Sequence, residues 1–186
     1  FYKSNRRWTE EGEDCACPDF FPFGDKHMLL MHTHGPYAKS QYYIGAYRNH
    51  SFYPEIHGQL SYRGSMHMAP ETLIDDQGRR IYWGWIGDAH DGDEFSEITD
   101  RGWSSVMTLP WHLYPSEDNT LRIKPVEELI GLRLDPMELP LMTIAEGEER
   151  AIDSISSNCM EIQMTVSFER NAVFGFKLLC SPDGSE

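Results

Sequence analysis

Two stretches of this chain, CPDFFPFGDKHMLLM at Cys17–Met31 and APETLIDDQGRRIYW at Ala69–Trp83, share one pattern. Each begins with a small residue, a proline and an acid, runs through an apolar segment to a Gly/Asp turn, and continues with a basic residue and a second apolar segment. The prolines Pro18 and Pro70 lie about 50 positions apart, a repeat length that is typical of propeller blades rather than of helical repeats.

Each repeat predicts four β-strands, because its aromatic and β-branched clusters favour strands over helices. Two consecutive four-stranded units predict an all-β fold with the architecture of a partial β-propeller. A sandwich of eight strands is the alternative that the pattern leaves open. After the strand that contains Pro18, the predicted strands are 26–34, 41–47 and 51–55, then 68–74, 79–86, 104–113 and 120–125.

The character of the sequence changes after Pro125. Residues 126–133 predict a short helical turn, because charged and aliphatic residues there follow a helical spacing. Pro136 and Pro140 come directly behind it, and closely spaced prolines are typical of a linker. A domain boundary is therefore expected in this part of the chain.

A second all-β domain is predicted beyond the linker. The segment 160–168 alternates apolar and polar residues, as a half-buried antiparallel strand does, and 174–180 predicts the next strand. We therefore expect residues 1–134 to form the C-terminal blades of a propeller. Residues 135–186 are expected to hold the linker and the opening of the second domain.

Composition and charge restrict the class of partner. The 40 % hydrophobic content is enough for a core, and the net charge of −14 comes from 16 basic and 30 acidic residues. Nucleic-acid affinity is carried mainly by Lys and Arg that neutralise phosphates, so neither nucleic acid nor an anionic membrane is an expected partner. No apolar stretch has the length that a membrane span requires.

The cysteines and histidines do not predict a metal site. Cys15 and Cys17 lack the second cysteine pair or histidine pair of a structural zinc site. All four cysteines, Cys15, Cys17, Cys159 and Cys180, are expected to be buried free thiols. His32 and His34 place both rings on one face of a strand, but no third ligand stands out in the sequence. We expect neither a metal nor a cofactor.

The ends of the chain predict a fragment. Phe1 is not an initiator methionine and no signal-peptide pattern follows, so we expect the chain to begin within a domain, with a further blade cut off before Trp8. The last residues, 181–186, form a turn sequence that normally leads into another strand. The compartment and the oligomeric state are left open by the sequence.

Several motifs in one order resemble glycoside hydrolase family 32, which contains the invertases, inulinases and levanases. The resemblance spans roughly residues 8 to 180, and its specificity comes from the order and spacing of the motifs rather than from any single one. The motifs are 17–22 (CPDFFP), 42–45 (YYIG), 69–72 (APET), 76–85 (DQGRRIYWGW), 102–110 (GWSSVMTLP) and 125–129 (PVEEL).

This resemblance implies a five-bladed β-propeller with a funnel-shaped active site on its axis, followed by a β-sandwich. It also implies hydrolysis, with retention, of a terminal β-fructofuranoside such as sucrose or a fructan. One carboxylate attacks the anomeric carbon, and a carboxylic acid protonates the leaving oxygen and then activates water. The family's Asn-Asp-Pro and Arg-Asp-Pro motifs belong to earlier blades and are not in this sequence, so the isolated chain is expected to be inactive.

The resemblance also implies an acid/base residue near the start of the first repeat. In the family it usually stands directly before the Cys of a Glu-Cys-Pro-Asp motif, and that position is Ala16 here. The nearest upstream acids are Asp14 and Glu13, and Glu13 is the predicted acid/base. A general acid must be protonated before the reaction, and burial against aromatic residues favours the protonated form. Charge pattern alone predicts instead a solvated acidic loop.

Four residues are predicted to contact the substrate: Asp14, Tyr62, His67 and Glu71. His67 and Glu71 flank the Ala-Pro pair of the second repeat. Tyr62 lies where many family members have Asp-Tyr-Gly and this chain has Ser-Tyr-Arg, so an acid that often binds sugar is missing. A lone histidine in an aromatic β-fold is also consistent with packing, and Asp19 is expected to face a structural partner.

Other features are interpreted as structural. Trp83, Trp85 and Trp103 are able to stack on a sugar ring, but at strand spacing most tryptophans pack in a core or between blades. The acidic loop 88–94 does not have EF-hand spacing, so an exposed loop is predicted instead of a calcium site.

The residues and the resemblance leave three functions open. The first is hydrolysis of fructose-containing oligo- or polysaccharides by a longer enzyme that includes this chain. The second is carbohydrate binding by a propeller that has lost its acid/base, as Ala16 would allow. The third is transfer of fructosyl units to another sugar, which uses the same carboxylates.

Overall fold

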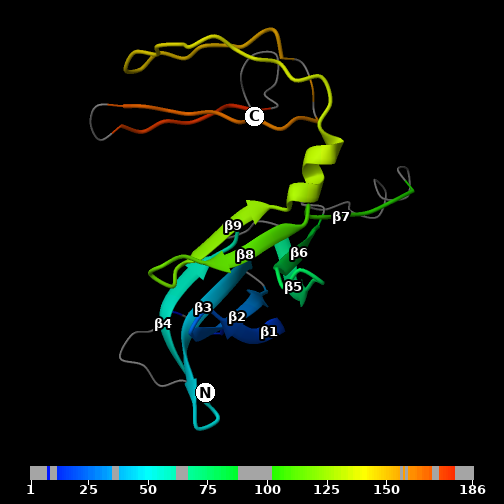
Figure 1. The fold of residues 1–186 in the computed structure, drawn as a ribbon, viewed down its shortest axis with the longest axis vertical. Helices are drawn as coiled ribbons and strands as arrows, with labels where there is room; N and C mark the ends of the chain where they lie inside the picture. The colour runs from blue at the N-terminus through cyan, green and yellow to red at the C-terminus, as the bar shows by residue number, and fades with distance from the viewer. Residues whose placement is uncertain are drawn as a thin grey trace. The chain divides into compact units, whose positions relative to one another are not determined.

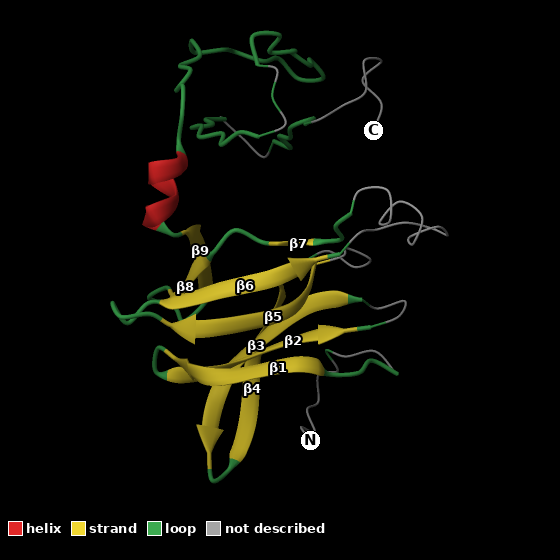
Figure 2. Cartoon of the chain, turned by 90° about the vertical axis from the view of Figure 1, so that its right-hand side faces the viewer, coloured by secondary structure: helices red, strands yellow, loops and turns green. Residues whose placement is uncertain are grey.

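The structure is a computed structural model, and it describes residues 8, 12–34, 38–61, 67–87, 102–155, 157, 159–168 and 172–178. The chain divides into two units, residues 1–129 and 130–186. The first unit contains two antiparallel sheets that follow one another along the sequence (Figures 1 and 2). The all-β prediction is confirmed for the described part of this unit.

The first sheet has the strand order β1-β2-β3-β4, so each strand pairs with the next one along the chain. Antiparallel neighbours of this kind need only short turns, which the Gly24-Asp25 and Asn49-His50 pairs supply. The strands are β1 (Ala16–Phe23), β2 (Lys26–Thr33), β3 (Lys39–Arg48) and β4 (Ser51–Gln59).

The second sheet repeats this arrangement with the order β5-β6-β8-β9, and a short strand, β7, pairs with the end of β6. In its turns at 75–79 and 116–120 the aspartates Asp75 and Asp118 accept hydrogen bonds from the backbone of the turn. The strands are β5 (His67–Ile74), β6 (Arg80–Ile86), β7 (Val106–Met107), β8 (Trp111–Pro115) and β9 (Leu121–Pro125).

The two repeats share a bulge as well as a sequence pattern. The β1–β2 register shifts between Ala16 and Asp19, and the β5–β6 register shifts at the matching place. Cys17 and Ala69, which precede the two prolines, both have a φ of 47°. A left-handed backbone is unfavourable for any residue with a Cβ, and a bulge re-aims the side chains next to it. The repeated bulge is therefore a built feature of both first strands.

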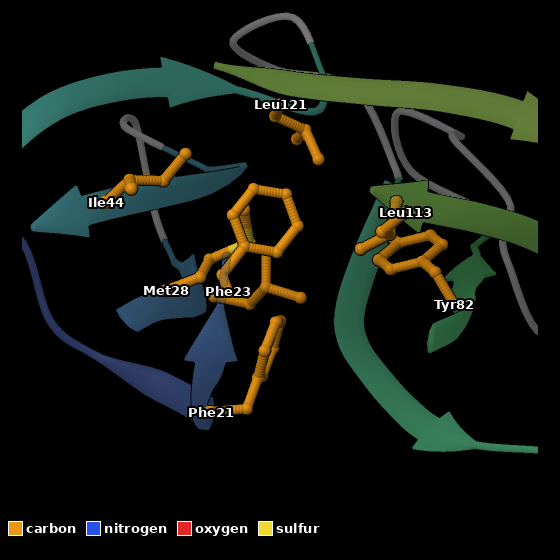
Figure 3. Packing of buried hydrophobic residues seen from close by; sticks show 8 residues of the cluster. Phe21, Phe23, Met28, Ile44, Tyr82, Leu113 and Leu121 are labelled. Carbon is orange, nitrogen blue, oxygen red and sulfur yellow. The ribbon is translucent and has the colours of Figure 1, made fainter. Parts of the chain in front are cut away.

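Most of the described core lies where the two sheets face each other. Phe21 and Phe23 of β1 pack with Leu30 of β2, and the second sheet contributes Tyr82 and Leu113. Figure 3 shows the side chains of the first sheet pointing towards Tyr82, Leu113 and Leu121 of the second. Each of these residues comes from an apolar segment of a predicted strand, so the alternation of the sequence places the core.

The prediction of one continuous strand over 104–113 is wrong. The structure has β7 and β8 there, separated by residues 108–110. Thr108 leaves the ladder because its backbone N–H donates to the Gly84 carbonyl and its hydroxyl accepts from the Gly84 N–H. Pro110 has no N–H to offer a neighbouring strand, which keeps the gap open.

The helical turn predicted over 126–133 is confirmed as a 3₁₀ helix, η2 (Glu127–Leu132). Among the described residues after it, the predicted segments 160–168 and 174–178 are not assigned as strands. Their apolar side chains, including Phe168 and Phe176, are largely exposed. Within this unit Arg133 forms an ion pair with Glu161, and Lys177 forms one with Glu149.

No helix in the described part of the chain is long and apolar enough to cross a membrane.

Gly45 carries a testable requirement of the first sheet. It lies at the register shift between β3 and β4, where a Cβ would collide with the backbone carbonyl oxygen of Tyr53. We expect Gly45→Ala to lower the free energy of unfolding by about 3 kcal/mol or more, because backbone must move to admit the methyl group. Denaturant titration measures the change.

Gly131→Ala is the control, since a Cβ at Gly131 meets no atom within 4 Å. It is expected to be neutral or slightly stabilising in the 3₁₀ helix. Equal stability of the Gly45→Ala and unsubstituted proteins would show that the β3–β4 bulge is wrongly placed.

Candidate active site

The topology gathers the predicted site residues at one end of the two sheets. β1 and β3 begin at this end, and β2 and β4 finish there. β5 begins at the same end, because the Ser40 hydroxyl at the start of β3 donates to the carbonyl oxygen of His67 at 2.8 Å. Glu13, Asp14 and His67 therefore come together, whereas Glu71 lies four residues further along β5.

Glu13 is buried in a charged pair. Its Oε1 lies 2.6 Å from Nζ of Lys39, and the side chains of Glu13 and Lys39 are 1 % and 9 % exposed. The interpretation as a solvated acidic loop is therefore wrong for Glu13. The contact with the Lys39 ammonium offsets part of the cost of burying this carboxyl group and holds it in one place.

Asp14 has the opposite environment, since half of its side chain is exposed. Its Oδ2 is 2.6 Å from Nδ1 of His34, and its Oδ1 accepts a hydrogen bond from the His34 backbone N–H at 2.8 Å. These hydrogen bonds lower the pKa of Asp14. Asp14 is thus an exposed carboxylate held in a fixed orientation.

Aromatic and amide groups surround the Glu13–Lys39 pair on the strands β3 and β4. Gln41 Oε1 accepts from the Tyr43 hydroxyl and lies 2.8 Å from Nε2 of His57. The rings of Tyr43 and His57 are stacked 4.7 Å apart, and Trp8 stacks on His57. Burial raises the pKa of Tyr43 to about 12, and the negative charge of Glu13 adds to this shift.

His67 is a packing residue in this structure. Its Nε2 is hydrogen-bonded to the Tyr82 hydroxyl at 2.5 Å, and its ring meets Trp111 edge-on. Burial lowers the pKa of His67, so the neutral ring is favoured. Gly84 is required beside it, because a Cβ there would collide with the imidazole.

Glu71 is exposed and lies near Asp19 of β1. The partial loss of solvent around its carboxyl raises the pKa of Glu71, and the charge of Asp19 raises this pKa further. Asp19 accepts a hydrogen bond from the Thr72 hydroxyl at 2.5 Å, and Arg80 donates to the same hydroxyl. Asp19 therefore faces a structural partner, as predicted.

Some predicted residues fall elsewhere. Tyr62 and the acidic loop 88–94 lie outside the described residues. Trp85 and Trp103 are exposed. The prediction of buried thiols is wrong for Cys15, Cys17 and Cys159, which are free but exposed. Cys15 and Cys17 lie at the open beginning of β1, where the bulge interrupts the ladder, and Cys180 lies outside the described residues.

Three residues of this end were not assigned a role by the sequence: Lys39, His34 and His32. Lys39 carried no motif, although it is the first residue of β3 and precedes the apolar run Tyr42–Gly45. His32 is 2 % exposed, and neither ring nitrogen has a hydrogen-bond partner among the described residues. Its ring meets that of His34 edge-on at 5.0 Å.

The described residues bring no three His, Cys, Asp or Glu side chains close enough together to hold a metal ion.

Comparison with known proteins identifies the source of the pattern. The model of the family described as "Glycosyl hydrolases family 32 N-terminal domain" matches residues 3–125. This range includes the Glu13–Asp14 pair and both sheets of the first unit.

Individual relatives agree with the family match. The cell wall isozyme of β-fructofuranosidase from Pisum sativum is 28 % identical over 182 residues, which are 82 % of this chain and 31 % of that protein. A sucrose-6-phosphate hydrolase from Klebsiella pneumoniae is 34 % identical over 138 residues, which are 63 % of this chain and 27 % of that protein. This chain thus spans about a third or less of the length of these relatives.

A solved structure supports the fold. A β-fructofuranosidase of Bombyx mori superposes with a TM-score of 0.52 and 24 % identity, over 65 % of this chain and 27 % of that protein.

His32 predicts a pH dependence of stability. Burial lowers the pKa of His32 below its ordinary value, and the neighbouring His34 acts in the same direction. As the pH falls through about 6.5, the unfolded chain binds this proton before the folded chain does, so stability is present above that pH and is lost below it. His32→Met is expected to reduce the slope between pH 7 and 5 by up to about 1.4 kcal/mol per pH unit.

Thermal unfolding across this pH range measures the slope. His50→Asn, in the exposed β3–β4 turn, is the control and should leave it unchanged. An identical slope in His32→Met and in the unsubstituted protein would contradict the burial of a neutral imidazole at this position.

Proposed function

Because this chain belongs to glycosyl hydrolases family 32, we propose that it forms part of a retaining β-fructofuranosidase that hydrolyses terminal fructosyl units of sucrose or fructans. The observation that carries the proposal is the family match over residues 3–125, which contains both repeats and the acid pair. The relatives include a β-fructofuranosidase, a sucrose-6-phosphate hydrolase and a fructan 1-exohydrolase from Triticum urartu.

The two sheets of the first unit are proposed to be two blades of a five-bladed propeller. Their sequential strand order and their repeated bulge support this reading over one eight-stranded sandwich. Residues 1–134 would then form propeller blades, and residues 135–186 a linker and the opening of a β-sandwich.

In the proposed reaction Glu13 is the acid/base. A carboxylate attacks the anomeric carbon of the fructosyl unit, the bond to the leaving oxygen breaks, and the proton of Glu13 passes to that oxygen. Water then loses a proton to Glu13 and displaces the enzyme carboxylate, which restores both groups. The nucleophile is assigned to a carboxylate outside the described residues, so the isolated chain is expected to be inactive.

Asp14, Tyr62, His67 and Glu71 are the proposed substrate contacts. The half-exposed side chain of Asp14 and the exposed position of Glu71 support their roles. His67 is less available, because Tyr82 occupies its Nε2. Fructosyl transfer differs from hydrolysis only in whether a sugar hydroxyl or water enters, so product analysis separates the two.

A carbohydrate-binding propeller without activity is the second candidate. The observation in its favour is Ala16, which stands directly before Cys17, where the family usually has its acid/base. Release of fructose from sucrose or inulin by the full-length protein would exclude this candidate.

The test of the acid/base is Glu13→Gln in the full-length protein, with sucrose and inulin as substrates. We expect the variant to lose about 100-fold or more in kcat, since it has neither a proton donor nor a base. On a p-nitrophenyl β-fructofuranoside, whose leaving group needs almost no proton, azide attacks the fructosyl enzyme without a base, so added azide should restore part of the activity and yield a fructosyl azide. Fructose and fructosyl azide are measured by chromatography.

Asp14→Asn is the matched control, because it changes the adjacent carboxylate in the same way. It is expected to raise KM with little loss of kcat, as a substrate contact would. If azide rescues Asp14→Asn and Glu13→Gln is fully active, Asp14 is the acid/base and the assignment to Glu13 is wrong.

A further inference from the structure

We propose that Lys39 is a positioning residue for the acid/base of this reaction, and that its ammonium holds the Glu13 carboxyl in the orientation from which a proton reaches the leaving oxygen. The inference rests on the proposed function and assigns a role in it to a residue of β3, a strand that holds none of the proposed catalytic residues. It follows from the contacts of Lys39, from its place in the hairpin and from the groups around it.

The contact between Lys39 and Glu13 is close and buried. Nζ and Oε1 are 2.6 Å apart, and the two side chains are 9 % and 1 % exposed. An exposed ion pair is screened and loosely held, whereas a buried one fixes the geometry of both groups. The Lys26–Glu55 pair at 2.7 Å shows the difference, because its side chains are 23 % and 49 % exposed.

The place of Lys39 in the sheet makes it a rigid support. It is the first residue of β3 and pairs with Thr33, the last residue of β2, which is fully buried. The Thr33 hydroxyl donates to the Lys39 carbonyl oxygen at 3.4 Å. The acid-bearing segment before β1 has no ladder of its own at Glu13, so its orientation depends on side-chain contacts.

The segment is held a second time one residue later. His34, directly after β2, binds both carboxylate oxygens of Asp14. Glu13 and Asp14 are therefore attached to the two sides of the β2–β3 connection, one through Lys39 and the other through His34. Successive residues that are fixed in this way cannot rotate independently, which is the condition for a well-placed proton donor.

The other charged and titratable groups near Glu13 do not replace Lys39. Tyr43 and His57 face the pair from β3 and β4, and burial favours the neutral form of both. Asp14 and Cys15 follow on the same segment, and Asp14 is paired with His34. Within the described ranges, Lys39 is therefore a cation that lies directly against the Glu13 carboxyl.

The proposal predicts a loss that depends on the leaving group. Cleavage of sucrose needs a proton on the departing glucosyl oxygen, whereas a p-nitrophenyl β-fructofuranoside departs as a stable nitrophenolate and needs almost none. A misplaced acid therefore slows the first reaction and spares the second. General damage to the fold lowers kcat/KM for both substrates equally.

The experiment compares kcat/KM of the full-length protein for these two substrates in Lys39→Met, Lys39→Arg and the unsubstituted form. For Lys39→Met we expect a loss of about 100-fold on sucrose and no more than about fivefold on the aryl fructoside. Lys39→Arg keeps the charge with a different shape, and it should recover most of the activity on sucrose. Lys26→Met, on the exposed pair, should match the unsubstituted protein on both substrates.

His34→Asn gives the matched comparison, because it loosens Asp14 instead of Glu13. Equal losses on the two substrates in Lys39→Met, or a leaving-group-dependent loss in His34→Asn alone, would overturn the proposal. If Lys39→Met does not fold, the ratio is taken from Lys39→Arg, and equal losses there would overturn it as well. A full-length protein that cleaves neither substrate refutes the proposed function itself.

Discussion

The packing of one sheet face against the next is the interaction on which the rest of the described structure depends. Phe21 and Phe23 of β1 meet Tyr82 and Leu113 of the second sheet, and this apolar contact is the main described core of the first unit. Burial of aromatic side chains of this size supplies a large share of the free energy of folding. Because this contact fixes β1, the first strand of the first sheet, the beginning of β1 is fixed too, and the site lies at this end.

Polar contacts then join the two sheets at the site end. Ser40 links the start of β3 to the start of β5, because its hydroxyl donates to the His67 carbonyl oxygen, and its backbone N–H donates to the Ser61 hydroxyl oxygen. Tyr82 extends from the core and closes this contact by hydrogen-bonding to the His67 ring. Tyr82 therefore belongs both to the core and to the contacts at the site end, so the two regions are packed together.

The sequence predicted much of the fold because its information was local. The two Pro-acid repeats, their apolar segments and their turns indicated the strands of both sheets, and 126–133 indicated the helical turn. It failed where pairing depends on distant residues: Gly84 and Thr108 break the strand predicted over 104–113, and nothing in the alternation of 160–168 reports whether a partner strand is present.

The site was harder to predict, for a related reason. Family resemblance pointed to Glu13 and Asp14, but the residues that hold them lie about 20 or more positions away, and only the return of β2 and β3 brings these together. The sequence alone does not indicate a role for a lysine at the start of an aromatic strand. The role becomes visible in the structure, where β2 and β3 pair and Lys39 lies beside Thr33.

The bulge before Pro18 also bears on how the family's spacing can vary. In a regular strand an extra residue reverses the side of every residue upstream, whereas a bulge absorbs it without disturbing the ladder downstream. With Cys17 already in a left-handed conformation, the segment from Glu13 to Ala16 is free of the strict two-residue alternation. The number of residues between the acid and the Cys-Pro pair can therefore change here. Lys39 and His34 still hold the carboxyl groups in place.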